Sequence, residues 1–251
     1  MQIVGYETGV DGSPALLIAD DGSVSTEPLD PGTELSYALG DRHCAGVVDD
    51  GAHESCANPA APYCEEHTYR WPCARCTGEC SMPLESCHEE HAIYLAAFAP
   101  ETFKVGVTRS WRLDTRLREQ GADRAAHLRT VADGRVARQI EAEIAADVGD
   151  RVRVPTKVEG LHESVDDAAW SALLADFDPV ETFSFDHGVD LDDRPVSETL
   201  ASGTVRGSQG RVLLLENGGS TYAVDMRDLV GYDLERGDTD RNLQSSLGAF
   251  G

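Results

Sequence analysis

Residues 44–87 have the sequence CAGVVDDGAHESCANPAAPYCEEHTYRWPCARCTGECSMPLESC, and this stretch contains all seven cysteines of the chain. The chain starts MQIVGYETGV, which lacks the basic and apolar segments of a secretory signal, so we expect a cytoplasmic protein. In a reducing compartment, clustered cysteines are more often thiolate ligands of a metal than disulfide partners. The stretch therefore predicts a zinc-binding module, with free or redox-active cysteines as the alternative.

Two complete sets of four ligands can be drawn from this stretch, and the sequence predicts two structural zinc ions. The sets are Cys44, Cys56, Cys64 and His67, and Cys73, Cys76, Cys80 and Cys87. Two thiolates in a CxxC knuckle converge on one ion, and four soft ligands close a tetrahedral site with no open position for water. The pairing could also be interleaved, or a cysteine could be replaced by a histidine, namely His43, His53, His88 or His91.

The apolar pattern of the whole chain predicts an α+β fold. Short apolar runs broken by Asp-Gly and Pro-Gly predict strands and turns near the N-terminus. Helices are expected over residues 110–120 and 134–148, and after a capping Ser164. We expect a small β-meander over residues 1–40 and the cysteine module over residues 41–90. A hairpin with two helices should follow over 91–160, a helix with a small β-barrel-like domain over 161–235, and a linker with a tail over 236–251.

The composition is strongly acidic. The chain has 45 Asp and Glu against 21 Lys and Arg, a formal net charge of −24, and only Lys104 and Lys157 are lysines. This bias is typical of proteins that work in molar salt, where carboxylates keep the surface hydrated, so we expect a haloarchaeal character. An acidic partner-binding protein is the alternative. Since no window reaches 18 apolar residues, we expect no membrane partner.

One segment departs from the acidic character. Residues 104–153 contain 11 Lys or Arg against 8 Asp or Glu. Arg112 and Arg116 are four residues apart, so they share one helix face, and Arg109 stands just before that helix. Such arginines are often merely solvated, but guanidinium groups suit phosphate best. We therefore expect Arg109, Arg112 and Arg116 to bind nucleic acid, although an acidic chain ordinarily argues against that partner.

Glu141 lies on the apolar stripe of its expected helix. It shares that stripe with Ala137, Ile144 and Val148. A carboxylate there needs a partner, and either an arginine or a metal ion would serve. Tyr94 lies in an expected strand, where an aromatic residue is by default part of the core.

Four sequence features together resemble the core of the GIY-YIG nuclease superfamily. They are Tyr94 in Ala-Ile-Tyr, Lys104 and Gly106 in Lys-Val-Gly, Arg116 in a first helix, and Glu141 in a second. The chain is also identified as a member of an uncharacterised family, domain of unknown function number 2797. Its cysteine-rich region precedes a segment of the form YLA…KVGxTR…RxxxQGA…E, and the resemblance covers most of residues 44–235.

The superfamily resemblance implies roles for these residues. Glu141 would hold Mg²⁺ or Mn²⁺, Arg116 would stabilise developing charge, and Tyr94 would position or activate water. Lys104 departs from the pattern, because the superfamily has its second tyrosine there. Lysine could replace a phenol as the base only if its pKa fell substantially.

The C-terminal residues Gln244, Leu247 and Phe250 fit Q-x-x-[LIM]-x-x-F, a peptide that docks on sliding clamps of the proliferating cell nuclear antigen type. The sequence as a whole predicts a metal-dependent GIY-YIG endonuclease that acts on DNA or RNA in replication or repair, recruited by the clamp. The first alternative is a non-catalytic zinc-containing nucleic-acid-binding factor that docks on the same clamp. A purely structural or protein-binding zinc protein is the second.

Overall fold

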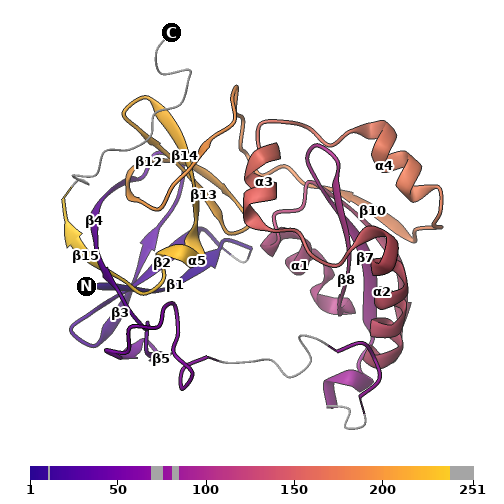
Figure 1. The fold of residues 1–251 in the computed structure, drawn as a ribbon, viewed down its shortest axis with the longest axis horizontal. Helices are drawn as coiled ribbons and strands as arrows, with labels where there is room; N and C mark the ends of the chain where they lie inside the picture. Colours follow the sequence, from indigo (N-terminus) through magenta and orange to yellow (C-terminus); the bar gives the residue numbers. More distant parts are fainter. Residues whose placement is uncertain (11, 69–75, 81–84, 238–251) are drawn as a thin grey trace. The chain divides into compact units, whose positions relative to one another are not determined.

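The computed structural model describes residues 1–10, 12–68, 76–80 and 85–237. The chain forms two compact units, Met1–Tyr69 with His187–Gly251, and Arg70–Asp186 (Figure 1). Both contain strands and helices, so the fold is α+β as expected. In the described part of the chain, no helix is long and apolar enough to cross a membrane.

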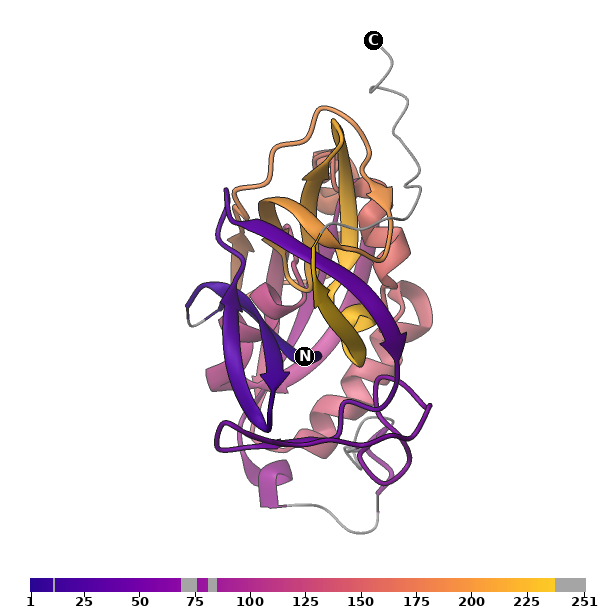
Figure 2. The ribbon, with the colours of Figure 1, turned by 90° about the vertical axis from the view of Figure 1, so that its left-hand side faces the viewer.

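The first unit is built around one sheet of eleven strands in the order β11-β14-β13-β12-β4-β15-β1-β2-β3-β6-β5. Its elements are β1 (Gln2–Thr8), β2 (Pro14–Asp20), β3 (Ser23–Pro28), β4 (Glu34–Arg42), β5 (Val47–Asp49), β6 (Ala52–Glu54), β11 (Val196–Ser197), β12 (Ala201–Gln209), β13 (Val212–Asn217), β14 (Ser220–Asp225), α5 (Met226–Leu229) and β15 (Tyr232–Arg236). Strand β15 pairs antiparallel with both β1 and β4, and β12 also pairs with β4. The N-terminal and C-terminal strands therefore share one sheet (Figure 2).

Tight turns join several of these strands. Asp21 and Gly22, between β2 and β3, both have positive φ, of 46° and 80°. Asp50 and Gly51 repeat this pair between β5 and β6, with φ of 46° and 78°. Two successive positive φ angles match the twist of antiparallel strands and favour Asp-Gly. The turn at Asp21 lies in the N-terminal segment for which the sequence predicted such turns. The sheet buries an apolar cluster that includes Ile3, Leu16, Leu29, Leu213 and Leu215.

The second unit has a four-stranded sheet in the order β10-β9-β7-β8. Its elements are η1 (Glu85–His88), β7 (His91–Phe98), β8 (Thr102–Arg109), η2 (Ser110–Arg112), α1 (Leu113–Glu119), β9 (Arg124–Val131), α2 (Gly134–Val148), α3 (Val154–Gly160), α4 (Asp167–Leu174) and β10 (Glu181–Ser184). Alternate residues of the buried strand β7 enter different clusters. Tyr94 and Phe98 pack with Leu117 of α1, whereas Ile93 and Leu95 pack in a cluster with residues of α2 and α4.

Helix α2 has the predicted bounds. The residue that follows it is hydrogen-bonded to β8, the outer strand of the hairpin. The backbone N–H of Val105 in β8 donates to the carbonyl of Gly149, at 2.9 Å, just after α2 ends. Helix α4 begins differently from the prediction. Its N-cap is Asp166, whose Oδ1 accepts from Ala169 N–H at 2.7 Å, so the capping prediction for Ser164 was wrong. A carboxylate and a hydroxyl serve equally well as caps, and the sequence offers both within two residues.

Candidate functional site

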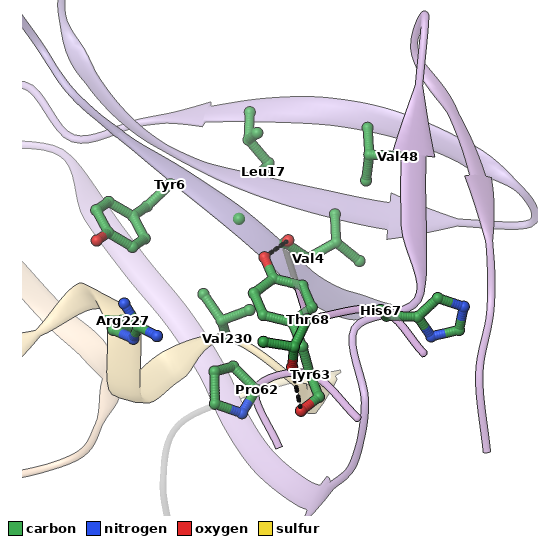
Figure 3. Close-up of a pocket in the computed structure, with 11 residues that line it drawn as sticks. Val4, Tyr6, Leu17, Val48, Pro62, Tyr63, His67, Thr68, Arg227 and Val230 are labelled. Atoms are coloured by element: carbon green, nitrogen blue, oxygen red, sulfur yellow. Dashed lines mark hydrogen bonds between the residues drawn. The ribbon is translucent and has the colours of Figure 1, made fainter. Parts of the chain in front are cut away.

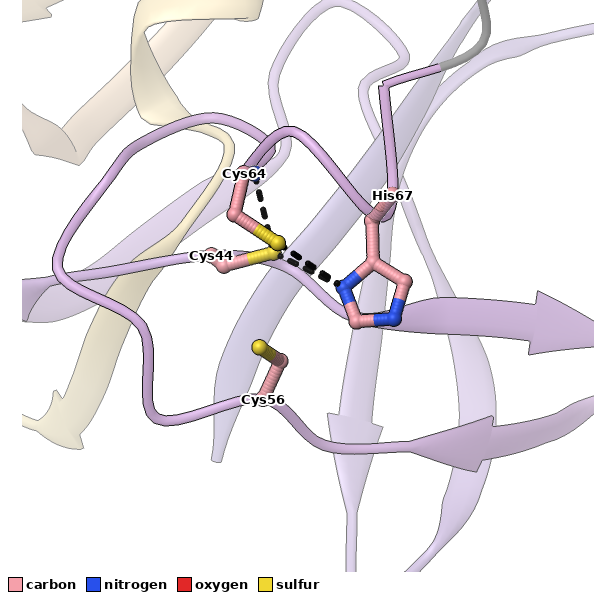
Figure 4. Close-up of side chains that lie close together, drawn as sticks. All are labelled: Cys44, Cys56, Cys64 and His67. Atoms are coloured by element: carbon pink, nitrogen blue, oxygen red, sulfur yellow. Dashed lines mark hydrogen bonds between the residues drawn. The ribbon is translucent and has the colours of Figure 1, made fainter.

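Four predicted zinc ligands meet in the first unit (Figure 4). The ligand atoms of Cys44, Cys56, Cys64 and His67 all lie within 4.8 Å of one another. His67 Nδ1 is 3.3 Å from Cys44 Sγ and 3.4 Å from Cys64 Sγ. Tetrahedral zinc, with bonds of about 2.0–2.3 Å, separates its ligand atoms by roughly 3.5 Å. The set could therefore hold one zinc ion.

Backbone hydrogen bonds favour the thiolate form of Cys44. Cys44 Sγ accepts from the backbone N–H of Cys64 at 3.3 Å and of Gly46 at 3.4 Å. Burial raises the pKa of the Cys44 thiol, but these two hydrogen bonds and one from His67 lower it to about 6. Gly46 has a φ of 65°, and a Cβ there would overlap with the carbonyl of Glu54, so this tight knuckle needs glycine.

Two histidines considered as alternative ligands support this loop instead. His53 Nε2 is 2.9 Å from the carbonyl oxygen of Ala45. His43 Nδ1 is 2.9 Å from the carbonyl oxygen of Cys56, and its Nε2 is 3.2 Å from Asp233 Oδ1. Both side chains thus hold backbone next to ligand cysteines, and such hydrogen bonds around a metal site commonly orient its ligands.

An apolar cavity of about 640 Å³ adjoins the zinc ligands (Figure 3). Tyr63 lines it, and its hydroxyl donates to the carbonyl oxygen of Val4 at 3.4 Å. Burial raises the pKa of both Tyr6 and Tyr63, so both phenols remain neutral. Because His67 and Thr68 also line the cavity, metal binding would fix one of its walls.

The second unit contains a pocket of about 400 Å³ that is lined by five arginines. They come from the end of β8, from η2 and α1, and from α2: Arg109, Arg112, Arg116, Arg135 and Arg138. The other lining residues are Cys76, Ser86, Cys87, His91, Val107, Thr108 and Gly134, and none of the described lining residues is Asp or Glu. We call this the arginine pocket. Guanidinium groups gathered in one pocket are suited to an anion.

Carboxylates behind the pocket hold its arginines in place. Glu119 pairs with Arg112 at 2.8 Å and with Arg116 at 3.1 Å. Glu141 Oε2 accepts from Arg138 Nη1 at 2.6 Å, and Glu89 lies 3.5 Å from Arg109 Nε. These ion pairs restrict the positions of four of the five pocket arginines. In addition, Arg135 Nε donates to the carbonyl of Gly78 at 3.3 Å.

The β7–β8 hairpin places Tyr94, Lys104 and Gly106 on one face of the sheet. Tyr94 is paired with Gly106, and Ala96 with Lys104. A Cβ at position 106 would lie 2.5 Å from both Cζ and Oη of Tyr94, so the ring lies directly over the glycine. The hydroxyl of Tyr94 is buried and accepts from Gln120 Nε2 at 2.7 Å.

Electrostatic interactions connect this face with both helices beside it. Burial raises the pKa of Tyr94, Arg116 and Gln120 act to lower it, and Glu141 acts to raise it. Burial and Arg116 lower the pKa of Lys104 to about 8, although Glu141 and Asp150 oppose this. Arg116 from α1 and Glu141 from α2 therefore both act on the pKa values of Tyr94 and Lys104, in opposite directions.

The family model for DUF2797, described as a protein of unknown function, matches residues 49–184. This is more than half of the chain. The chain belongs to the DUF2797 family. The matched region of this DUF2797 protein contains the whole arginine pocket and three of the four zinc ligands, all except Cys44. Searches of curated proteins and of solved structures found no match.

The predicted nucleic-acid contacts of this DUF2797 protein, Arg109, Arg112 and Arg116, all line the arginine pocket. The sequence-based prediction did not include Arg135 and Arg138. They are three residues apart at the start of α2, so a search for arginines at helical spacing would have found them. Cys73 and the residues predicted to bind a sliding clamp, Gln244, Leu247 and Phe250, lie outside the described residues.

Proposed function

We propose that this DUF2797 protein binds a backbone phosphate of nucleic acid in the arginine pocket and cleaves the phosphodiester in the manner of a GIY-YIG nuclease. The observation that carries the proposal is that Arg116, which lines a pocket with four other arginines, and Glu141 both act on the pKa values of Tyr94 and Lys104. In a chain with a net charge of −24, such a pocket is a strong local exception. Its guanidinium groups suit the oxygens of a phosphodiester.

Glu141 is the residue that would hold Mg²⁺ or Mn²⁺. Its side chain is 13% exposed, and Arg138 donates to Oε2, so an ion would be held through Oε1. One carboxylate fits Mg²⁺, which commonly takes its other ligands from water and substrate phosphates. When bound, the ion supplies polarisation of the scissile phosphate.

The other residues have separate roles in this proposal. Arg116 lines the pocket and stabilises the charge that develops on the phosphate oxygens. Lys104, with a pKa of about 8, accepts a proton from the attacking water. Tyr94 has a raised pKa and an enclosed hydroxyl, so it stays protonated and positions its neighbours.

This role for Lys104 predicts the pH dependence of cleavage. The free amine is the base, so the single-turnover rate should rise with pH through about 8 and level off above it. The charged groups that set this pKa are Arg116, Arg138, Glu141 and Asp150. Lys104→Met should be slow and should lose the inflection. A wild-type rate without an inflection near pH 8, at constant substrate affinity, would contradict the assignment.

The binding step predicts a uniform loss of affinity from the pocket arginines. Arg112→Ala should weaken binding of every sequence alike and reduce the slope of log K against log salt by about one. Fluorescence anisotropy with labelled oligonucleotides over a salt series measures both quantities. Arg206→Ala is the matched control, because Arg206 is a half-exposed arginine that pairs with Glu216 in the first unit. Equal losses in the two variants would show a general charge effect and not a site.

Binding without catalysis is the second candidate function, and one observation favours it. The ion pair between Arg138 and Glu141, at 2.6 Å, already satisfies the carboxylate that a metal ion would need. A protein with this arrangement could retain the arginine pocket as a phosphate-binding surface alone.

The second zinc set also belongs to this proposal. The backbone N–H of Gly78 donates to Cys76 Sγ at 3.3 Å, as Gly46 does to Cys44. Gly78 and Gly46 both have positive φ, so the two Cys-x-Gly turns share one knuckle geometry. We propose that Cys76, Cys80 and Cys87 hold a second structural zinc with Cys73 and close one side of the arginine pocket, which Cys76 and Cys87 line.

The proposed cellular setting of the protein rests on its amino-acid composition and on its C-terminal residues. We propose a haloarchaeal, cytoplasmic protein, because the acidic surface and the preference for arginine over lysine suit molar salt. We also propose that residues 242–251 recruit it to the sliding clamp during replication or repair. Leu247 and Phe250 are three residues apart, so one helical turn would present both to an apolar pocket.

A further inference from the structure

Trp111 is an exposed aromatic residue at the rim of the arginine pocket. It lies in η2 between two pocket residues, Arg109 and Arg112, and is 71% exposed. The guanidinium carbons of Arg109 and Arg112 lie 6.0 and 5.9 Å from its ring centroid. An indole so exposed contributes little apolar burial to the fold.

The indole is nevertheless held in position. Its Nε1–H donates to Glu89 Oε2 at 3.3 Å, and the other oxygen of Glu89 is 3.5 Å from Arg109 Nε. One carboxylate thus fixes both the tryptophan and a pocket arginine. Single exposed apolar residues are common on proteins, but the carboxylate that anchors Trp111 also holds Arg109, which lines the arginine pocket.

We infer that Trp111 is a stacking platform for an unpaired nucleobase, so that the substrate is a single strand or a nucleotide displaced from a duplex. This inference rests on the proposed phosphate binding in the arginine pocket. The faces of bases inside a duplex are covered by their neighbours, whereas the base of a single strand can stack on an aromatic ring. A phosphate held by Arg112 would bring its own nucleoside next to Trp111, and the flanking guanidinium groups would strengthen the contact.

Binding of three probes by the full-length, zinc-loaded protein tests the inference. The probes are a short oligothymidylate, an abasic strand with the same phosphates, and a duplex of the same length. Trp111→Ala should weaken oligothymidylate binding by roughly 5- to 100-fold and leave abasic-strand binding unchanged. Trp111→Phe should retain most of the affinity, because phenylalanine keeps a stacking face. Val180→Ala, which also removes a strongly exposed apolar side chain of this unit, is the matched control.

The outcomes separate this inference from the proposed function. If Arg112→Ala weakens all probes and Trp111→Ala weakens none, the phosphate site stands and the stacking platform is refuted. That result would point to a protein partner for Trp111. Equal loss of the abasic strand and of oligothymidylate in Trp111→Ala, or tighter binding of the duplex than of the single strand, also overturns the inference. If the wild-type protein binds no probe, the proposed function fails, and the inference fails with it.

Discussion

Replacing Cys64 with alanine is expected to remove one zinc ion per chain and to lower the free energy of unfolding by more than about 4 kcal/mol. Cys64 is 2% exposed and does more than supply one thiolate. Its backbone N–H also donates to Cys44 Sγ, and its carbonyl accepts from the N–H groups of His67 and Thr68. Without the metal, Cys44, Cys56 and His67 are no longer linked through one ion, so the loop that carries them loses this cross-link.

Elemental analysis and thermal unfolding measure these two effects on the same samples. His67→Ala should lose the same ion, whereas His53→Ala should keep it, since the imidazole of His53 bonds to the carbonyl of Ala45 and supplies no ligand atom. The number of zinc ions per wild-type chain also tests the second ligand set. A change from two ions to one in Cys64→Ala would support two zinc sites. An unchanged zinc content in Cys64→Ala would refute the assignment of this ligand set.

Local sequence signals predicted several parts of the fold. The Asp-Gly turn at Asp21 follows from backbone conformations that few other residue pairs adopt. Helix α2 ends where the sequence predicted, because Gly149 has a φ of 84° that suits glycine. The joining of distant strands was not predictable in this way. β15 fits between β1 and β4 through backbone hydrogen bonds, which carry no side-chain signature along the chain.

In the candidate site, too, some features could be predicted from the sequence and others could not. The positions of the first four zinc ligands, and the spacing of Arg109, Arg112 and Arg116, were enough to predict that each set lies together. The partner of Glu141 stayed open between arginine and metal, because its apolar stripe indicates only that a partner is needed; the structure supplies Arg138. The lowered pKa of Lys104 was not predictable from the sequence, since it depends on burial and on Arg116 from another element.

Glu141→Gln is expected to reduce metal-dependent cleavage by roughly 1,000-fold while nucleic acid binds at least as tightly. The amide has nearly the shape of the carboxylate but not its charge, so it cannot hold a divalent ion. Arg138 loses its ionic partner at 2.6 Å, and its freed charge strengthens the attraction of the arginine pocket for phosphate. Nicking of a labelled single strand with Mg²⁺ or Mn²⁺ in high salt gives the rate, and anisotropy without metal gives the affinity.

Glu143→Gln is the matched control, because Glu143 lies on the same helix and is exposed. It removes the same charge two residues away, so it should change neither the rate nor the affinity. If both variants cleave like the wild type, the activity does not come from this site. If the wild type binds single strands but shows no metal-dependent nicking, Glu141 stays paired with Arg138 and holds no metal ion. The arginine pocket is then a phosphate-binding surface without catalysis, because the only carboxylate assigned to the metal is already neutralised by its own helix.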